Sequence, residues 1–297
     1  MIALTDAPGF LRSTAAARSI ALCAYHLAPD GPVRAALIEA ARRGADVEVR
    51  LEAVPFGSQG GQQGAENAAT VAAVRAASGH AELVGYAGAT PWHMKAALVD
   101  GTAYLDDRNW AADGRETILR DDDPDDVAAV RQTLAGAPGR DGHLRCTKHE
   151  AIELESEVIR GAAAAPVAVE TESFGLGAIY ADLLHRAQAG EPARLLVSSL
   201  ELAEAGAGRE AHALGRLAAA GVDVRVVDTD EKIALAGDRA WVGSANATYA
   251  NGPAGAQIDW GLATRVPTLV DGLRAAFERN WNAAAPFANR MFRLSAY

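Results

Sequence analysis

A histidine and a lysine two residues apart, His93 and Lys95, carry the strongest chemical signal in this chain. They open the segment His-Met-Lys-Ala-Ala-Leu-Val-Asp, whose apolar run is typical of a β-strand. Side chains at positions i and i+2 of a strand project from the same face, so the imidazole and the ammonium point together. An imidazole is a base or nucleophile near neutral pH, and a fixed cation beside it attracts anions. The pair therefore indicates chemistry on an anionic group.

A later segment, residues 230–246, repeats this pattern without a gap against residues 93–109. Each segment contains two apolar runs around Asp-Gly or Gly-Asp, which predicts a β-hairpin with a two-residue turn. Lys232 stands at the position of Lys95, but Asp230 stands where the first segment has its histidine. The sequence thus predicts the hairpin twice and the imidazole once.

Both segments end in an asparagine, which adds amide donors to the two lysines. Asn109 ends the first segment, and Gly-Ser-Ala-Asn ends the second, where Ser244 and Asn246 share one strand face. An anion between two such hairpins would meet two ammonium groups, two amides and one hydroxyl. That set of donors suits a phosphate group with an imidazole in line.

Matching strand, loop and helix segments precede the two hairpins. Three polar residues, His26, Glu172 and Ser173, follow the first strands of these segments, and strand ends often line the site of open α/β folds. Each of these three residues is a candidate for the site, with a surface position as the alternative.

The remaining organisation follows from composition. Residues 117–150 contain the acidic run DDDPDD, and we expect them to form a solvated connector around one short helix. The predicted domains are therefore a first repeat over residues 1–116, this connector, and a second repeat over residues 151–297.

The pattern His-x-Lys, then Asp, then Gly-Ser-x-Asn resembles the signature of the phospholipase D superfamily, whose motif is duplicated as it is here. The resemblance implies catalytic or phosphate-binding roles for His93, Lys95, Asp100, Asn109, Lys232, Ser244 and Asn246. It also implies the fold: two tandem α/β repeats, each a mixed β-sheet flanked by helices, that share a central cleft.

This chain departs from the family pattern at several positions. Asp106 and Asp107 replace Gly-Ser in the first motif, and Asp230 and Gly237 replace the histidine and aspartate of the second. In both motifs the segment after the aspartate position is one residue shorter than usual. The resemblance assigns two further carboxylates, Glu116 and Asp259, to positions where the family often has an acid that orients the opposite histidine.

The family implies a metal-free phosphodiesterase in which one histidine attacks phosphorus and a second protonates the leaving group. We therefore expect a phosphodiesterase or phosphatidyl-transfer-like enzyme that forms a phosphohistidine on His93. Asp230 is one substitute for the missing acid, but Lys232 beside it would favour its charged form. The alternatives are a catalytically impaired protein that binds phosphate-containing ligands without turnover, or a nuclease of the same superfamily. The sequence leaves open whether the chain is an enzyme.

Composition limits the partners. The net charge of −10 disfavours a non-specific nucleic-acid binder without excluding a local basic pocket. No Cys/His spacing predicts zinc and no Gly-rich loop predicts a nucleotide, so we expect no metal and no cofactor. The ligand would be a phosphodiester, of a lipid or another class, and a monomer suffices for the site. Cys23 and Cys146 lie far apart, and no apolar run fits a signal peptide or membrane span, so we expect a cytoplasmic protein.

Overall fold

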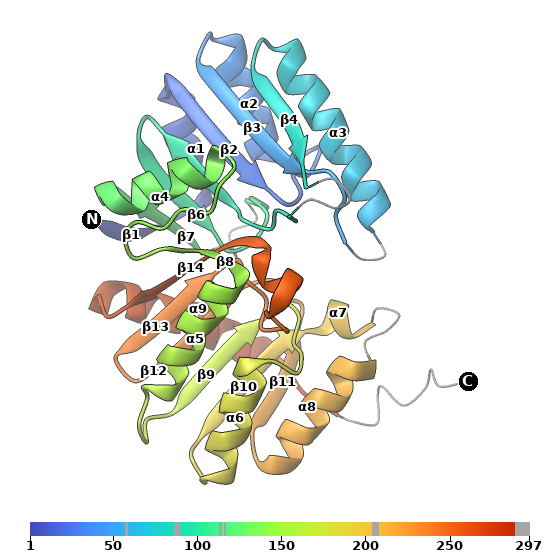
Figure 1. The fold of residues 1–297 in the computed structure, drawn as a ribbon, viewed down its shortest axis with the longest axis vertical. Coiled ribbons are helices and arrows are strands. Elements are labelled where there is room, and N and C mark those ends of the chain that lie inside the picture. The colour runs from blue at the N-terminus through green and yellow to red at the C-terminus, as the bar shows by residue number, and fades with distance from the viewer. Residues whose placement is uncertain (57–58, 86–89, 113–114, 116, 204–207, 289–297) are drawn as a thin grey trace. The chain divides into compact units, whose positions relative to one another are not determined.

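The computed structural model describes residues 1–56, 59–85, 90–112, 115, 117–203 and 208–288. The chain forms two compact units (Figure 1). The first contains Met1–Lys148 with Ala256–Trp260, and the second contains His149–Gly255 with Gly261–Tyr297. The short segment Ala256–Trp260 therefore packs with the first unit, although it follows the second hairpin in the sequence.

The first sheet is mixed and has seven strands in the order β1-β7-β6-β5-β2-β3-β4. Strands β2, β3 and β4 run parallel to one another, and the other neighbours pair antiparallel. The strands in chain order are β1 (Ile2–Thr5), β2 (Ser19–Ala24), β3 (Asp46–Glu52), β4 (His80–Val84), β5 (Ala96–Val99), β6 (Thr102–Asp106) and β7 (Ile118–Asp121).

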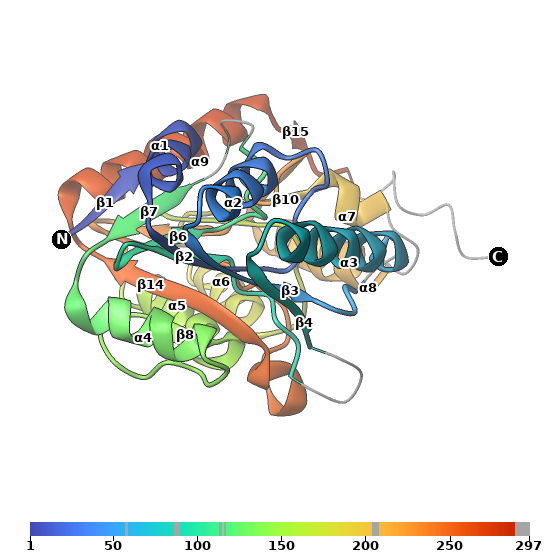
Figure 2. The same ribbon diagram turned by 90° about the horizontal axis from the view of Figure 1, so that it is seen from above.

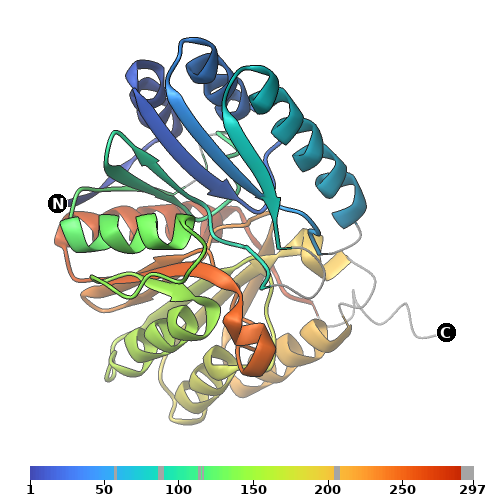
Figure 3. The same cartoon turned by 45° about the horizontal axis from the view of Figure 1, so that its top comes forward.

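Helices cover both faces of this sheet (Figures 2 and 3). Three of them, α1 (Ala7–Ala16), α2 (Pro32–Arg42) and α3 (Gly60–Ala76), share one apolar core with β2 and β3. Helix α4 (Pro124–Leu134) packs against β2, β5 and β6 from the other side. Helix α2 illustrates the local cause, because its buried residues recur at helical spacing and it ends at Arg42, just before Gly44, whose φ is +85°.

The second sheet repeats the order of the first. Read from β8 it runs β8-β14-β13-β12-β9-β10-β11, with the short β15 added at the end. The strands are β8 (Arg145–Thr147), β9 (Val167–Thr171), β10 (Ala193–Ser198), β11 (Asp223–Val227), β12 (Ile233–Ala236), β13 (Arg239–Gly243), β14 (Ile258–Thr264) and β15 (Ala285–Pro286). Equal strand order in the two sheets confirms the predicted fold class of two tandem mixed α/β repeats.

The helices of the second repeat are also arranged on two sides. Residues of α5, α6, α7 and α8 form one core with β9 to β13, whereas α9 packs against β11, β12 and β13. The bounds are α5 (Lys148–Arg160), α6 (Ala178–Gln188), α7 (Ser199–Ala203), α8 (Gly208–Ala220), α9 (Pro267–Ala283) and a 3₁₀ turn at Gly252–Ala256.

Both predicted hairpins are present, and each turn suits its residues. In the β5–β6 turn Asp100 and Gly101 have φ of +48° and +86°, as a type I′ turn requires. In the β12–β13 turn Gly237 alone has a positive φ, +61°, which suits glycine at the first position of a type II′ turn. These turns set the register of the two hairpins, and Lys95 and Lys232 immediately precede β5 and β12.

The segment expected as a solvated connector contributes to the first repeat. Strand β7 lies between β1 and β6, so the sheet continues past residue 116. Within the acidic run, Asp121 and Asp126 are buried, because Asp121 accepts from the Asp123 backbone and Asp126 accepts from the backbones of His143 and Leu144. The acidic residues satisfy buried backbone donors there. Across the described residues, every helix is too short or too polar to cross a membrane.

Candidate functional site

Two backbone hydrogen bonds fix the place of His93 in the first unit. The His93 amide donates to the Ile258 oxygen at 2.8 Å, and the Ile258 amide donates to the Pro91 oxygen at 2.9 Å. Trp92 and Ile258 form a parallel bridge in the same stretch. Segment Ala256–Trp260 therefore lies beside residues 91–93, which brings Asp259 next to the histidine.

The imidazole of His93 contacts the carboxylate of Asp259. His93 Nδ1 lies 2.9 Å from Asp259 Oδ1, and Asp259 is fully buried while His93 is 8% exposed. A carboxylate only accepts hydrogen bonds, so this contact places the ring proton on Nδ1 and leaves the lone pair on Nε2. Nε2 is therefore the acceptor atom of this imidazole.

Lys95 lies against the same ring. Its Nζ is 3.0 Å from His93 Nε2 and 3.1 Å from Nδ1, and the residue is 1% exposed. The Tyr25 ring packs edge-on to the imidazole at 4.9 Å and lies 5.7 Å from the Lys95 ammonium. A buried ammonium favours an anion as a neighbour because burial has removed its water. The first unit thus joins a histidine, a cation and a carboxylate in one buried cluster.

Lys148 is a further buried cation of the first unit that the sequence interpretation missed. Burial lowers the pKa of the Lys148 ammonium, and the charge of Asp259 acts in the opposite direction. No sequence signal identifies it, since Lys148 stands in an ordinary polar helix start and becomes buried only through the fold.

The aspartates that replace Gly-Ser in the first motif are buried and bind backbone groups. Asp106 Oδ2 accepts from the Trp110 amide at 2.6 Å, and the Asp106 main-chain oxygen accepts from Trp260 Nε1 at 2.9 Å. Asp107 Oδ1 accepts from the Thr117 amide at 3.1 Å. The two carboxylates thus hold the chain after β6, and the main-chain oxygen of Asp106 attaches it to segment Ala256–Trp260.

Asn109 follows β6 in the chain and contacts the residues that follow β2. Its Oδ1 accepts from the His26 amide at 3.2 Å. The His26 side chain contacts α3 instead, with Nε2 2.7 Å from Glu66 Oε2. The structure therefore gives His26 a carboxylate partner of its own.

Asp100 lies away from the histidine. It occupies the β5–β6 turn, and its Oδ1 accepts from the amides of Arg18 and Ser19 at 3.0 and 2.9 Å. The register pairs Val99 with Ile20 and Ala96 with Cys23, so Asp100 and His93 are at opposite ends of β5. Asp100 thus anchors the hairpin to the start of β2.

The second unit brings Lys232, Asn246 and Glu172 together. Lys232 is 1% exposed, and its Nζ lies 3.1 Å from Glu172 Oε2 and 2.6 Å from the Asp230 main-chain oxygen. Asn246 Nδ2 donates to Glu172 Oε2 at 3.2 Å, and Asn246 Oδ1 accepts from the Ser173 amide at 3.2 Å. Ser244 is fully buried just after β13. Two of the predicted phosphate ligands of this repeat, Lys232 and Asn246, thus contact the same carboxylate.

More carboxylates line this part of the second unit. Ser173 Oγ donates to Glu201 Oε2 at 3.0 Å, and the Phe174 amide donates to Glu210 Oε1 at 2.9 Å. Burial, reinforced by the charges of Glu201 and Glu172, raises the pKa of Glu210 to about 7. The surroundings of Lys232 are therefore acidic, in contrast to the Tyr25 side of Lys95. Glu116, the predicted counterpart of Asp259, lies outside the described residues.

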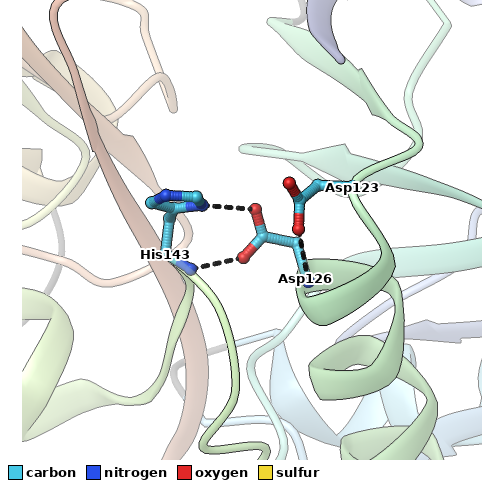
Figure 4. A group of neighbouring side chains, drawn as sticks. All are labelled: Asp123, Asp126 and His143. Carbon is cyan, nitrogen blue, oxygen red and sulfur yellow. Dashed lines mark hydrogen bonds and ion pairs between the residues drawn. The ribbon is translucent and has the colours of Figure 1, made fainter.

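One group in the described part of the chain has the residue types of a metal site (Figure 4). The donor atoms of Asp123, Asp126 and His143 lie within 4.8 Å of one another. Asp123 caps α4, however, and Asp126 binds the backbone amides of His143 and Leu144. These bonds explain the group as a link between α4 and the loop before β8, so we assign no metal to it.

Comparison with solved structures gives the fold a name. Phosphatidylserine synthase from Haemophilus influenzae Rd KW20 aligns with a TM-score of 0.71 and 9% identity, over 100% of this chain and 90% of that one. Polyphosphate kinase from Porphyromonas gingivalis aligns with a TM-score of 0.65 and 17% identity, over 95% of this chain and 46% of the kinase. The chain has a phospholipase D-like fold. It spans less than half the length of that kinase.

Other comparisons add less. Nuc of Salmonella typhimurium, a phospholipase D family member, aligns over 48% of this chain at 15% identity and a TM-score of 0.42. No protein-family model matches the chain, and no curated protein matches it by sequence. The phospholipase D-like fold therefore rests on structure, and its two repeats here differ in chemistry: the first holds an imidazole beside a lysine, and the second holds a glutamate beside a lysine.

Proposed function

We propose that this chain catalyses phosphoryl transfer from a phosphodiester, with His93 as the nucleophile. The observation that carries the proposal is the buried cluster in which Asp259 holds Nδ1 and Lys95 lies beside Nε2 of one imidazole. The names of the phosphatidylserine synthase and polyphosphate kinase that share the fold support phosphoryl chemistry in general.

The first step would form a phosphohistidine. The Nε2 lone pair attacks phosphorus, a P–N bond forms, and the P–O bond to the leaving group breaks with its electron pair. The ring gains positive charge in this step, and the Asp259 carboxylate at Nδ1 stabilises it. Lys95 would pass from Nε2 to a phosphoryl oxygen as the ligand enters. Asn109 of the first unit, and Lys232, Ser244 and Asn246 of the second, are further proposed phosphate ligands, each within its own repeat.

The second step would be slow. Water or another acceptor attacks phosphorus, the P–N bond breaks, and the electron pair returns to Nε2, which needs a base to take the proton of the acceptor. Asp230 stands at the position of the second histidine of the motif, so a carboxyl group replaces the imidazole there. A carboxylate could accept that proton but could not protonate an alkoxide. The chain should therefore prefer leaving groups that depart without a proton.

The second candidate is a phosphate-binding protein without turnover. The contact between Lys232 and Glu172 favours it, because the carboxylate already neutralises one of the proposed phosphate ligands. A nuclease is a third candidate, which the net charge of −10 disfavours.

Burst kinetics separate these candidates. With bis(p-nitrophenyl) phosphate the wild-type chain should release about one equivalent of p-nitrophenol per chain quickly and then turn over slowly. His93→Ala should lose both phases, whereas His80→Ala, at the exposed start of β4, should keep them. Asp230→His should speed the slow phase by restoring a second imidazole. Full activity in His93→Ala would exclude this mechanism, and binding of phosphate esters without any burst would favour the binding protein.

A further inference from the structure

The two repeats place different side chains at one equivalent position. In the first repeat Asn109 Oδ1 accepts from the His26 amide at 3.2 Å, and in the second Asn246 Oδ1 accepts from the Ser173 amide at the same distance. These matched bonds show that each asparagine holds the residue that follows the first inner strand. The residue just before each held amide is therefore equivalent, and it is Tyr25 in one repeat and Glu172 in the other.

In the first repeat this position is neutral. The Tyr25 ring lies 4.9 Å from the His93 ring and 5.7 Å from the Lys95 ammonium. An aromatic ring attracts a cation through its quadrupole but leaves the unit charge in place. Tyr25 can thus accompany Lys95 without removing its attraction for an anion.

In the second repeat this position carries a charge. Lys232 Nζ and Asn246 Nδ2 lie 3.1 and 3.2 Å from the same atom, Glu172 Oε2. An ammonium and an amide that converge on one oxygen form the donor arrangement suited to an oxygen of a phosphate. The Glu172 carboxylate therefore takes the oxygen position that a phosphate would need on these two donors.

The two partners of this contact differ in burial. The Lys232 side chain is 1% exposed, so its ammonium depends on protein groups for compensation, whereas the Glu172 side chain is 28% exposed and borders solvent. Glu201 and Glu210 lie close enough to Glu172 to influence the same group of carboxylates. An entering anion would therefore meet a lysine whose charge Glu172 already neutralises. The anion would either displace the Glu172 carboxylate or bind beside it against its repulsion.

We propose that Glu172 is the charge selector of the second repeat: its carboxylate admits singly charged phosphodiesters and excludes doubly charged phosphate monoesters. The inference rests on the proposed function, because it assumes that Lys232 and Asn246 bind phosphate oxygens. The repulsion between the carboxylate and the ligand grows in proportion to the ligand's charge. The repulsion therefore costs a monoester dianion twice the free energy that it costs a diester monoanion. If it lowers the diester affinity by a given factor, it lowers the monoester affinity by the square of that factor.

The test is binding of two stable probes by isothermal titration calorimetry at pH 8, diphenyl phosphate as the monoanion and phenyl phosphate as the dianion. The wild-type chain should prefer the diester. Glu172→Gln keeps the size of the side chain and removes its charge, and should strengthen diester binding by about 3–10-fold and monoester binding by about 10–100-fold. The ratio of the two affinities is the readout, because a loss of structure alone would weaken the binding of both probes, whereas removal of the charge should strengthen both and change their ratio.

Two further variants complete the test. Glu157→Gln removes the same charge from an exposed position of the second unit and should leave the ratio unchanged. Tyr25→Glu places a carboxylate at the equivalent position of the first repeat and should weaken phenyl phosphate more than diphenyl phosphate, which tests the principle even if Glu172→Gln does not fold.

The outcomes separate the two proposals. Diester binding by the wild-type chain with an unchanged ratio in Glu172→Gln overturns the role of Glu172 and leaves the proposed function standing. If neither probe binds to the wild-type chain or to Glu172→Gln, and no diester is turned over, the proposed function falls and this inference falls with it.

Discussion

Replacement of Asp259 by asparagine tests how the first repeat activates its imidazole. Asp259 is fully buried, and its Oδ1 lies 2.9 Å from His93 Nδ1. When Nε2 attacks phosphorus the ring becomes positive, with its charge centre about 4 Å from that of the carboxylate, which is worth about 4 kcal/mol at an effective dielectric constant of 20. Asp259→Asn should therefore slow formation of the phosphohistidine by about 10³-fold.

The tautomer acts in the same direction. An asparagine amide can donate to Nδ1, which would move the ring proton to Nε2 and remove the attacking lone pair. The loss should thus appear in the burst rate with bis(p-nitrophenyl) phosphate and should exceed any change in substrate affinity.

Stability must be measured in the same preparations. The Asp259 charge partly offsets the burial of Lys148, so Asp259→Asn leaves that ammonium with less compensation. Asp121→Asn is the matched control, because Asp121 is an equally buried aspartate of the first unit that accepts from the Asp123 amide at the start of α4. It should keep the wild-type burst. A burst rate in folded Asp259→Asn within about tenfold of wild type, equivalent to ~1.4 kcal/mol, would refute the electrostatic role.

Three other results are expected. Asp100→Ala should lower the melting temperature by about 2–6 °C, because the amides of Arg18 and Ser19 lose their acceptor. Asp100→Asn keeps an acceptor and should melt near the wild-type temperature. Both variants should keep the burst. Burial and the charge of Glu231 raise the pKa of Glu170 from 4.5 to about 8, so the free energy of unfolding should fall as the pH rises from 4.5 to about 8. Urea titrations at pH 5 and pH 8 should show that Glu170→Gln reduces this fall, and an unchanged slope would exclude a raised pKa. Hydrolysis should survive EDTA, because lysines can supply the positive charge at the phosphate, and complete loss on chelation with recovery on adding metal would contradict the proposed chemistry.

The local parts of this fold are predictable from the sequence. Apolar runs around Asp100-Gly101 and Gly237-Asp238 predict both hairpins. A period of two predicts that His93 and Lys95 lie side by side, as they do, although β5 begins only at Ala96. These features depend on neighbouring residues and on turn chemistry alone. The duplicated order of elements similarly predicts two related sheets, which the equal strand order confirms.

The contacts between distant segments are not predictable in this way. The pair of His93 and Asp259 joins residues 166 positions apart and depends on how segment Ala256–Trp260 packs. The pair of Glu172 and Lys232 depends on the pairing of β9 with β12, whereas the sequence shows only that both residues follow or precede strands.

Burial of charge is also hidden from composition. The acidic run from Asp121 to Asp126 has the sequence of a solvated segment, yet two of its carboxylates are buried because backbone amides need acceptors there. Composition reports the charge of a segment, and only the fold shows which groups that charge satisfies.

The most direct measurement of the central claim is mass spectrometry of the chain quenched in base during the burst. A phosphoryl adduct should appear on the peptide that contains His93, should be labile in acid as expected for a P–N bond, and should be absent from His93→Ala. The adduct should decay at the rate of the slow phase and should accumulate less in Asp230→His. An adduct on any other residue, or steady turnover with an unmodified His93 peptide at every time point, would contradict the account.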